Sequence, residues 1–392
     1  MKVLNFDIDL DLLACNQERL SNLILSYMLD QSPSVFNWLD YSNNSVFLEP
    51  LLFNYFLQKH DSRAYTIEQA VLGYNSGSNL PKTIRVISNQ EGIVYLPKLG
   101  YIQQNFSQKE FVIETEAIFD LASEYPLFKA PNTSIEIYRH IPDIVVSLEK
   151  EKLIEAAEET FLGHIKVVCH SIGRMKVFMP DLFSLIERVT RNLSIFNSAT
   201  QNSFAAINQH GTAFINLENK KQSEVFFIDD IAHQCGHIIF NILTLDVENY
   251  IKIPKTTFLS QLNVNSDDHR TVYSAFHGLF TYTCILHSLD KCLDSGLFKN
   301  NLKLKKEVYA RIGFYLSKFS FDLSYLNHRF IFTEAGWSFL EDFAYGYKRI
   351  LKKYEHVTQV FDYSNQPYNF NFQKFEYINK SNPTLNHKNQ SE

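Results

Sequence analysis

Two histidines four residues apart are the residues of this chain whose types and spacing most clearly suggest chemistry. His233 and His237 lie in the segment DDIAHQCGHIIFNIL, whose apolar pattern predicts a helix. Residues four apart on a helix lie one turn apart on the same face, so both imidazoles could bind a single metal ion. Such pairs also occur in purely structural helices, so a metal site would need at least one further ligand.

The residue after the first histidine argues against one kind of metal chemistry. In zinc proteases with the motif H-E-x-x-H, the glutamate is the base that activates the metal-bound water. Here that position is Gln234, whose amide cannot accept the proton. A zinc hydrolase is therefore the weakest interpretation. A redox metal does not need this base, and non-haem Fe(II) oxygenases use three protein ligands and leave other positions open.

His277 is the best candidate for the third ligand. It lies 40 residues after the second histidine of the pair, in HRTVYSAFHGLFTYTCILH, an apolar stretch that predicts a second helix able to pack on the first. His269 and His287 lie nearer the ends of this stretch and are weaker candidates. If the ring of His277 points elsewhere, Asp230 or Asp268 is the alternative ligand. A core histidine bonded to a backbone carbonyl is the competing structural interpretation.

Three neighbours of the histidine pair have roles that the sequence leaves open. Asp229 and Asp230 precede the pair by about one turn. Either carboxylate could orient a ligand histidine by accepting a hydrogen bond, or both could simply suit the positive end of the helix dipole. Cys235 faces away from the pair by helix geometry, so we do not expect it to be a ligand.

The order of the chain's segments resembles that of the HExxH-type, 2-oxoglutarate-dependent peptide β-hydroxylases, which modify ribosomally made peptides. The matching segments are NSFAAINQHGTAFINL, DDIAHQCGHIIFNIL, DHRTVYSAFHGLFTY and FTEAGWSFLEDF, between about residues 200 and 345. Gln234 departs from the family's motif. The resemblance implies Fe(II) held by His233, His237 and His277, 2-oxoglutarate as the co-substrate, and a precursor peptide as the substrate.

A 2-oxoglutarate site also needs a cation for the distal carboxylate, and a guanidinium suits it because it can bind both oxygens. On this resemblance Arg270 is the first choice, since it lies seven residues, or two helical turns, before His277. Arg329 is the second choice, and an ion-paired surface side chain is the alternative for each. A different reading of Gln234 is that the chain is a catalytically silent relative that binds peptides as a scaffold subunit.

The composition excludes several classes of protein. Its net charge of −6 argues against a nucleic-acid binder with a broad basic face. With 45% hydrophobic and 14% aromatic residues, the chain can bury a large core. No run of 18 or more apolar residues occurs, which argues against a transmembrane helix and a membrane partner. Five scattered cysteines without a CxxC pair favour a reducing compartment, so we expect a cytoplasmic protein.

The elements that must position these residues are mostly helices. Strand patterns occur within 83–114 and near 134–141, and a Gly-marked β-like segment lies near 202–218. Helical patterns cover 9–60 with a break at Ser32-Pro33, a stretch from about 148, 179–196, 223–245, 268–293, 301–319 and 333–354. We therefore expect a mainly α protein with a small antiparallel β-sheet, an α+β fold with a helical metal-binding core.

Three regions follow from these patterns. Residues 1–145 form a mixed α/β region whose sheet could bind a peptide by strand addition. Residues 146–360 form a helical HxxxH catalytic domain, and residues 361–392 form a polar tail that we expect to fray. The basic segment KNNLKLKKEVYARI is either a solvated helix face or a site for an acidic leader peptide.

Overall fold

The computed structural model describes residues 1–42, 44–57, 65–75, 79–105, 109–141, 157–262 and 268–380. The chain is mainly α-helical and has small sheets of two to four strands, which confirms the expected fold class. Within the described ranges, no helix combines the length and the apolar character needed to span a membrane.

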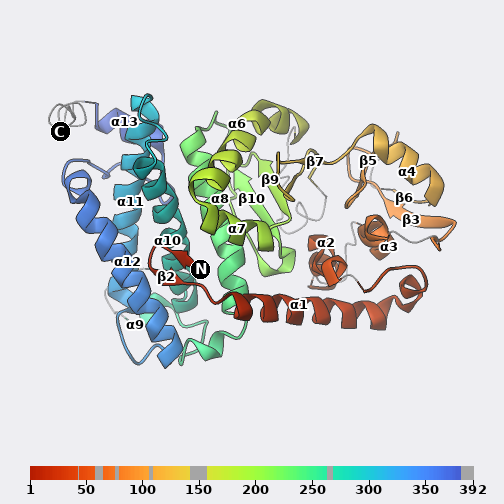
Figure 1. Cartoon of the computed structure of the whole chain (residues 1–392), viewed down its shortest axis with the longest axis horizontal. Coiled ribbons are helices and arrows are strands. Elements are labelled where there is room, and N and C mark those ends of the chain that lie inside the picture. The colour runs from red at the N-terminus through yellow and green to blue at the C-terminus, as the bar shows by residue number, and fades with distance from the viewer. Residues whose placement is uncertain are drawn as a thin grey trace.

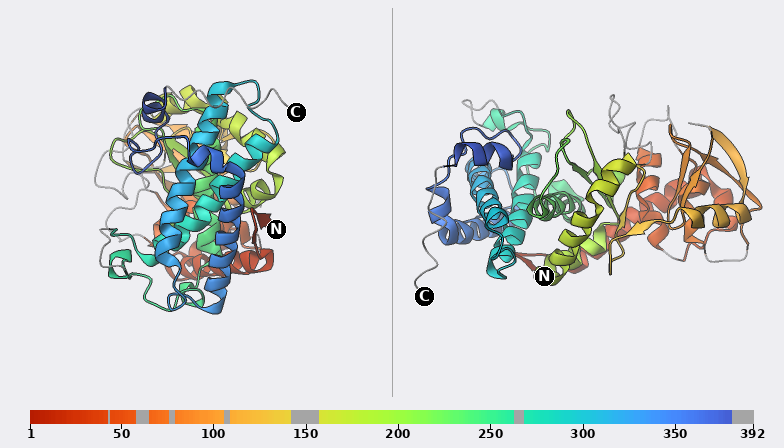
Figure 2. Two further views of the ribbon diagram at one scale, coloured as in Figure 1. Left: turned by 90° about the vertical axis from the view of Figure 1, so that its left-hand side faces the viewer. Right: turned by 90° about the horizontal axis from the view of Figure 1, so that it is seen from above.

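Four long helices pack together toward one end of the molecule, with α8 (Glu224–Leu243) lying next to the four-stranded sheet (Figure 1). They are α8, α10 (Val272–Asp294), α11 (Leu302–Leu326) and α12 (Glu334–Thr358). Helix α10 contacts both α8 and α11, and α11 packs beside α12, as Figure 2 also shows. Ser223, Thr271 and Asn301 cap the first three of these helices, because each side chain accepts a hydrogen bond from a backbone N–H three residues ahead. All four helices were expected from their apolar periodicity, and α11 extends seven residues beyond its predicted end.

A four-stranded sheet lies beside α8 and is covered by α6 (Ala157–Phe178) and α7 (Pro180–Val189) (Figure 1). Its strand order is β10 (Thr212–Asn216), β9 (Asn192–Phe196), β8 (Glu136–Ile137) and β7 (Phe128–Lys129). The pairs β10–β9 and β9–β8 are parallel, whereas β8–β7 is antiparallel. The largest sheet is thus mixed, although an antiparallel one was expected. Every residue of β9 and β10 is buried, as in strands covered on both faces, so these strands lack the alternating pattern of an antiparallel sheet.

The N-terminal part of the chain contributes further helices and short strands. Its helices are α1 (Leu10–Gln31), α2 (Pro50–Leu57), α3 (Ile67–Val71) and α4 (Thr115–Glu124). Its strands are β1 (Lys2–Val3), β2 (Phe6–Asp7), β3 (Thr83–Ile87), β4 (Ile93–Leu96), β5 (Gly100–Gln103) and β6 (Glu110–Glu114). The pairs β1–β2, β3–β6 and β4–β5 are antiparallel, as the strand patterns within 83–114 predicted for the last two. The 3-10 helices are Pro33–Asn37, Asn44–Leu48, Leu72–Tyr74, Ile207–Gln209 and Val247–Asn249, and α9 spans Leu259–Leu262.

One hydrophobic core joins the first residues of the chain to the helices at the other end. Phe6 on β2 packs with Phe280 of α10 and with Phe339 and Phe343 of α12, at ring-centroid distances of 5.5, 4.7 and 5.0 Å. Helix α1 packs on α8. A second, smaller core lies among β3–β6 and α4. The expected boundary near residue 145, and the start of the helix expected from about 148, lie outside the described residues.

The segment after residue 360 packs on the helices. It contains the short helix α13 (Phe372–Ile378), which contacts α11, and it buries Phe361, Phe370 and Phe375. The expectation of a fraying tail is therefore wrong for residues 361–380. The segment was expected to fray because most of its residues are polar, but a few aromatic side chains bind it to the core. Residues 381–392 lie outside the described part of the chain.

Candidate functional site

The structure brings the three predicted histidines together. His233 and His237 lie one turn apart on α8, with their ring centroids 4.9 Å apart. His277 projects from α10, and its ring centroid lies 4.5 Å from that of His237. The two helices approach closely at Gly236, where a Cβ atom would lie 3.4 Å from the Sγ atom of Cys284 on α10.

The three imidazoles are the right type of ligand for a transition metal. Burial lowers the pKa of His237 to about 4 and holds the pKa values of His233 and His277 well below 6.5. Mutual repulsion lowers the pKa values of His233 and His277 further. At neutral pH the rings are therefore uncharged, which is the form that binds metal ions.

One nitrogen–nitrogen distance in the histidine cluster is compatible with two ligands of the same metal ion. The Nδ1 atom of His237 lies 3.0 Å from the Nε2 atom of His277. That separation suits an N–H···N hydrogen bond, and it equals the separation of about 3.0 Å between two nitrogens bound at right angles to one ion with bonds of about 2.1 Å. Among the described residues, however, no three His, Cys, Asp or Glu side chains already converge as a metal site requires. Binding an ion would therefore require rotation of at least one ring.

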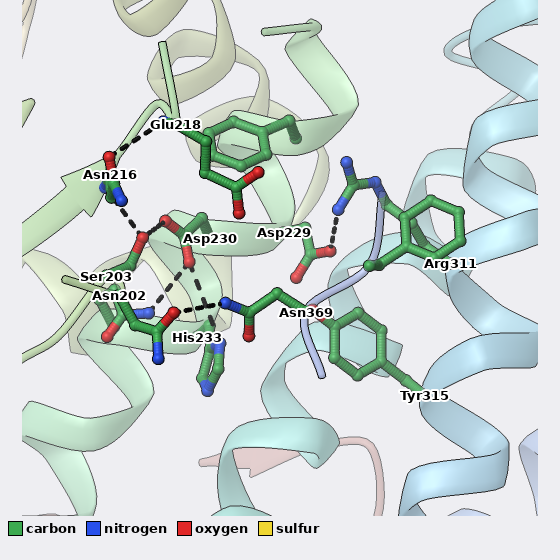
Figure 3. A pocket seen from close by; sticks show the side chains of 13 residues that line it. Asn202, Ser203, Asn216, Glu218, Asp229, Asp230, His233, Arg311, Tyr315 and Asn369 are labelled. Carbon is green, nitrogen blue, oxygen red and sulfur yellow. Dashed lines mark hydrogen bonds and ion pairs between the residues drawn. The ribbon is translucent and has the colours of Figure 1, made fainter. Parts of the chain in front are cut away.

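Asp230 links the histidine cluster to a polar network (Figure 3). Its carboxylate accepts hydrogen bonds from the Ser203 hydroxyl at 2.6 Å and from the Gln234 amide at 2.9 Å. It also lies 3.9 Å from the Nδ1 atom of His233. Burial raises the pKa of Asp230 to about 7 although both hydrogen bonds act to lower it. The separation of 3.9 Å is too long for a hydrogen bond to the uncharged imidazole, so Asp230 lies beside His233 without accepting from it.

Gln234 has a clear local role that explains its type. Its side chain is buried, and its Nε2 atom donates to Asp230 while its Oε1 atom has no hydrogen-bond partner. A glutamate in this place would set a second carboxylate against Asp230 in a site with little solvent, which is unfavourable. The Gln234 amide therefore suits this position because it donates a hydrogen bond to the Asp230 carboxylate and adds no charge.

Arg311 is a buried residue of this region that the sequence reading did not single out. It lies on α11, 4% exposed, and bridges Asp229 on α8 at 2.7 Å and Glu307 on its own helix at 2.7 Å. Burial raises the pKa of Asp229, and the Arg311 guanidinium and the Tyr315 hydroxyl oppose that rise. The sequence did contain a signal for this triad, because Glu307 and Arg311 are four residues apart and therefore lie on one face of a helix. Both residues belong to the basic segment that we expected to be a solvated face or a site for a leader peptide.

A polar pocket opens beside the network (Figure 3). Its volume is about 60 Å³. It is lined by Asn202, Ser203, Asn216, Glu218, Phe226, Asp229, Asp230, His233, Gln234, Arg311, Tyr315, Asn369 and Phe370. Asn369 comes from the C-terminal segment, and its amide donates to Asn202 at 2.8 Å across the exposed side of the pocket. The segment expected to fray therefore forms part of the wall.

The two arginines predicted to bind 2-oxoglutarate both have carboxylate partners. Arg270 is held by two carboxylates, Asp268 at 2.7 Å and Asp322 at 2.5 Å. Arg329 is exposed, pairs with Glu334 and lies over the ring of Trp337. Asp268 therefore serves as the partner of Arg270. Neither guanidinium lines the pocket that contains His233.

Lys318 is a cation near the histidines that the sequence reading missed. Its ammonium donates to the backbone carbonyl of Tyr368 at 3.0 Å and lies over that ring, and among the described residues no carboxylate lies within ion-pair distance. Burial lowers the pKa of Lys318 to about 8, and its charge contributes to the low pKa of His233. The signal available in the sequence was a lone lysine in the apolar part of α11.

The remaining candidates lie outside the cluster. His287 accepts a hydrogen bond at Nδ1 from the backbone N–H of Leu4, at 3.0 Å, and is a core histidine. His269 is exposed. Cys235 is buried, and burial raises the pKa of its thiol to about 12, which keeps it protonated. Comparison of the chain with protein-family models finds no matching family, and comparison with curated proteins finds no match.

Proposed function

We propose that this protein is an Fe(II)- and 2-oxoglutarate-dependent oxygenase that hydroxylates the β-carbon of a residue in a ribosomally made peptide. The observation that carries the proposal is the contact of three uncharged imidazoles from α8 and α10. His233, His237 and His277 would hold the iron. Together with 2-oxoglutarate and O₂, that iron would supply an oxidant able to replace a C–H hydrogen with a hydroxyl group.

The chain's own residues would orient the ligands and exclude water. Asp230 would accept a hydrogen bond from His233 once that ring turns toward a bound ion, and Ser203 and Gln234 would hold Asp230. The fully buried ring of Phe240 packs on His277 and on Phe276, which keeps one side of the cluster dry.

In this proposal Lys318 binds the distal carboxylate of 2-oxoglutarate. The carboxylate partners of the two residues favour Lys318 over Arg270. Lys318 has no carboxylate partner among the described residues, whereas Arg270 would have to leave Asp268 and Asp322. A lysine binds a carboxylate as a point charge and lacks the two-pronged geometry of a guanidinium.

A second candidate function is a peptide-binding or scaffold subunit without redox chemistry. The observation that favours it is the lack of a preformed three-ligand group among the described residues, together with Gln234 in the motif. A zinc hydrolase is third, because Gln234 cannot serve as the base. For each of these functions we propose a cytoplasmic location, which the five free cysteines favour, and a precursor peptide as the partner.

Metal binding under anaerobic conditions tests the proposal. We expect about one iron per chain, 2-oxoglutarate-dependent and O₂-dependent succinate release, and the gain of one oxygen atom by a co-expressed precursor peptide. His237→Ala and His277→Ala should each lose the iron, and a Co(II)-loaded sample should lose its visible absorption bands in the same variants. His269→Ala is the matched control, since this histidine is exposed and outside the cluster.

The outcomes separate the three functions. Wild-type protein that binds no transition metal and releases no succinate, yet binds the precursor peptide, would support the scaffold function and overturn the oxygenase. Tight zinc with peptide hydrolysis would support the third candidate. Iron retained equally in all three variants would overturn the ligand assignment.

A further inference from the structure

We propose that the pocket beside His233 binds a primary ammonium group, and that Gln234, Asp229 and Asp230 form its acceptor wall. This inference deepens the proposed function, and rests on it, in naming the substrate class: a peptide that places an ammonium group next to the reacting carbon. The binding itself needs no metal, which allows a separate test.

The first observation is an unused acceptor. Gln234 is 2% exposed and lines the pocket, yet its Oε1 atom has no hydrogen-bond partner. The amide orientation is constrained, because its Nε2 atom donates to the Asp230 carboxylate at 2.9 Å. A buried acceptor without a partner is unfavourable. A ligand that donates a hydrogen bond would satisfy it.

The second observation is the charge of the wall. Glu218, Asp229 and Asp230 line the pocket together with a single guanidinium, that of Arg311. This guanidinium is already shared between Asp229 and Glu307, a fourth carboxylate. Lys220 pairs with Glu218, so Asp230 is the lining carboxylate without a lysine or arginine partner among the described residues, and a cationic ligand would pair with it.

The third observation is the size and lining of the pocket. A volume of about 60 Å³ is several times the roughly 10–15 Å³ that a cavity needs to hold one water, and it suits an ammonium with an adjoining methylene. The Arg311 guanidinium already lies over the rings of Phe226 and Phe370, and Tyr315 supplies further aromatic surface, which attracts cations. An ammonium offers three donors in a compact group, whereas a guanidinium is larger and planar.

The pocket is placed to position a substrate. His233 lines it, so a group bound there lies next to the histidine cluster. The Asn202–Asn369 hydrogen bond lies at its exposed side, where the rest of a peptide would extend. The ammonium could belong to a lysine side chain or to the N-terminus of a peptide, since the chemistry that the wall recognises is the same.

Ligand binding to the full chain, treated with a chelator and free of metal, tests the proposal by calorimetry. Four probes separate the possibilities: Nα-acetyl-lysine amide carries a side-chain ammonium, norleucine amide carries an α-ammonium, Nα-acetyl-norleucine amide carries neither, and Nα-acetyl-arginine amide carries a guanidinium. We expect one of the two ammonium probes to bind at least about tenfold more tightly than the neutral probe. Which one does so identifies the source of the ammonium. This comparison uses only the wild-type chain, so it does not depend on the folding of any variant.

Gln234→Met removes the unused acceptor and should weaken the preferred ammonium probe by about tenfold, while the neutral probe changes little. Gln103→Met, at an exposed glutamine of β5, is the matched control and should change neither. Equal binding of the charged and neutral probes, preference for the arginine probe, or an unchanged affinity in Gln234→Met would overturn the proposal. Those failures would leave iron binding and succinate release intact, whereas loss of the proposed oxygenase function would leave ammonium binding to the metal-free chain intact.

Discussion

At the scale of single residues, the hydrogen bonds of the buried side chains near the candidate site explain their residue types. Gln234 stands where the H-E-x-x-H motif has a glutamate, and its amide donates to Asp230. The same acid accepts from Ser203 and approaches His233. The residue that departs from the motif is therefore the one that stabilises the carboxylate beside the first histidine.

Gln234→Glu should destabilise the protein. The change replaces a hydrogen-bond donor with a second carboxylate next to Asp230, and both groups are buried, so we expect a loss on the order of 3 kcal/mol in the free energy of unfolding at pH 8. Urea unfolding followed by circular dichroism measures it. Gln103→Glu, at an exposed position, should cost little. An equal effect at the two positions would contradict the role assigned to the Gln234 amide.

Glu49 makes stability depend on pH. Burial raises its pKa from 4.5 to about 7, although Tyr74 donates to it at 2.6 Å and Arg191 lies nearby. The folded state therefore holds this proton more tightly than the unfolded state. Its contribution to stability is fully present below about pH 4.5, falls as pH rises to 7, and amounts to about 3 kcal/mol.

Glu49→Gln removes this titration. Between pH 4.5 and 8 the wild type should lose stability relative to the variant, so the variant should have the higher urea midpoint at pH 8. A difference between the two midpoints that stays constant across this range would show that Glu49 does not titrate as its burial indicates.

At the scale of elements, a buried ion triad joins α8 to α11. Arg311 contacts Asp229 and Glu307, whose side chains are each 2% exposed. Arg311→Met leaves both carboxylates unpaired in the core, so we expect a loss of about 3–5 kcal/mol in the free energy of unfolding. The triple variant Arg311→Met, Asp229→Asn, Glu307→Gln should recover most of that loss, because no charge of the triad remains in the core.

A surface pair provides the control for this element. Arg19 binds Asp246 at 2.7 Å with both side chains partly exposed, so Arg19→Met should cost less than about 1 kcal/mol. Guanidinium chloride unfolding compares the two variants. If Arg311→Met costs no more than Arg19→Met, the triad does not hold the two helices together.

At the scale of the whole molecule, the first strands complete the core of the helical end. Phe6 is 1% exposed among aromatic rings of α10 and α12, and α1 continues from these strands along α8. We therefore expect the N-terminal segment and the helices of this end to unfold in a single cooperative transition. This coupling can be followed because Trp38 lies near the N-terminal elements and Trp337 lies on α12.

Phe6→Ala should lower stability by about 3–5 kcal/mol and should shift the unfolding midpoints of both regions. Fluorescence of Trp38→Phe and Trp337→Phe chains reports each region separately. Phe330→Ala, at a side chain that is 58% exposed, is the control and should shift neither. A shift seen by only one tryptophan would mean that the two regions unfold independently.

Local sequence patterns were enough to predict the long helices and the face that His233 and His237 share. Apolar periodicity predicted α8, α10 and α12, and helical spacing placed His233 and His237 on one face. These predictions succeed because they depend on neighbours within about one turn. His277 was also nominated from sequence, since it lies in a second apolar helix, and the structure brings its ring against that of His237.

Which charged side chains meet depends on how the helices pack. Arg270 is paired with Asp322, 52 residues away, and Arg311 is paired with Asp229, 82 residues away. No local pattern specifies such partners, because they depend on how α10, α8 and α11 pack. The mixed sheet and the packing of the C-terminal segment were likewise decided by long-range contacts. A few buried rings, such as that of Phe375, outweigh a polar composition because burying apolar surface is favourable wherever the chain can reach it.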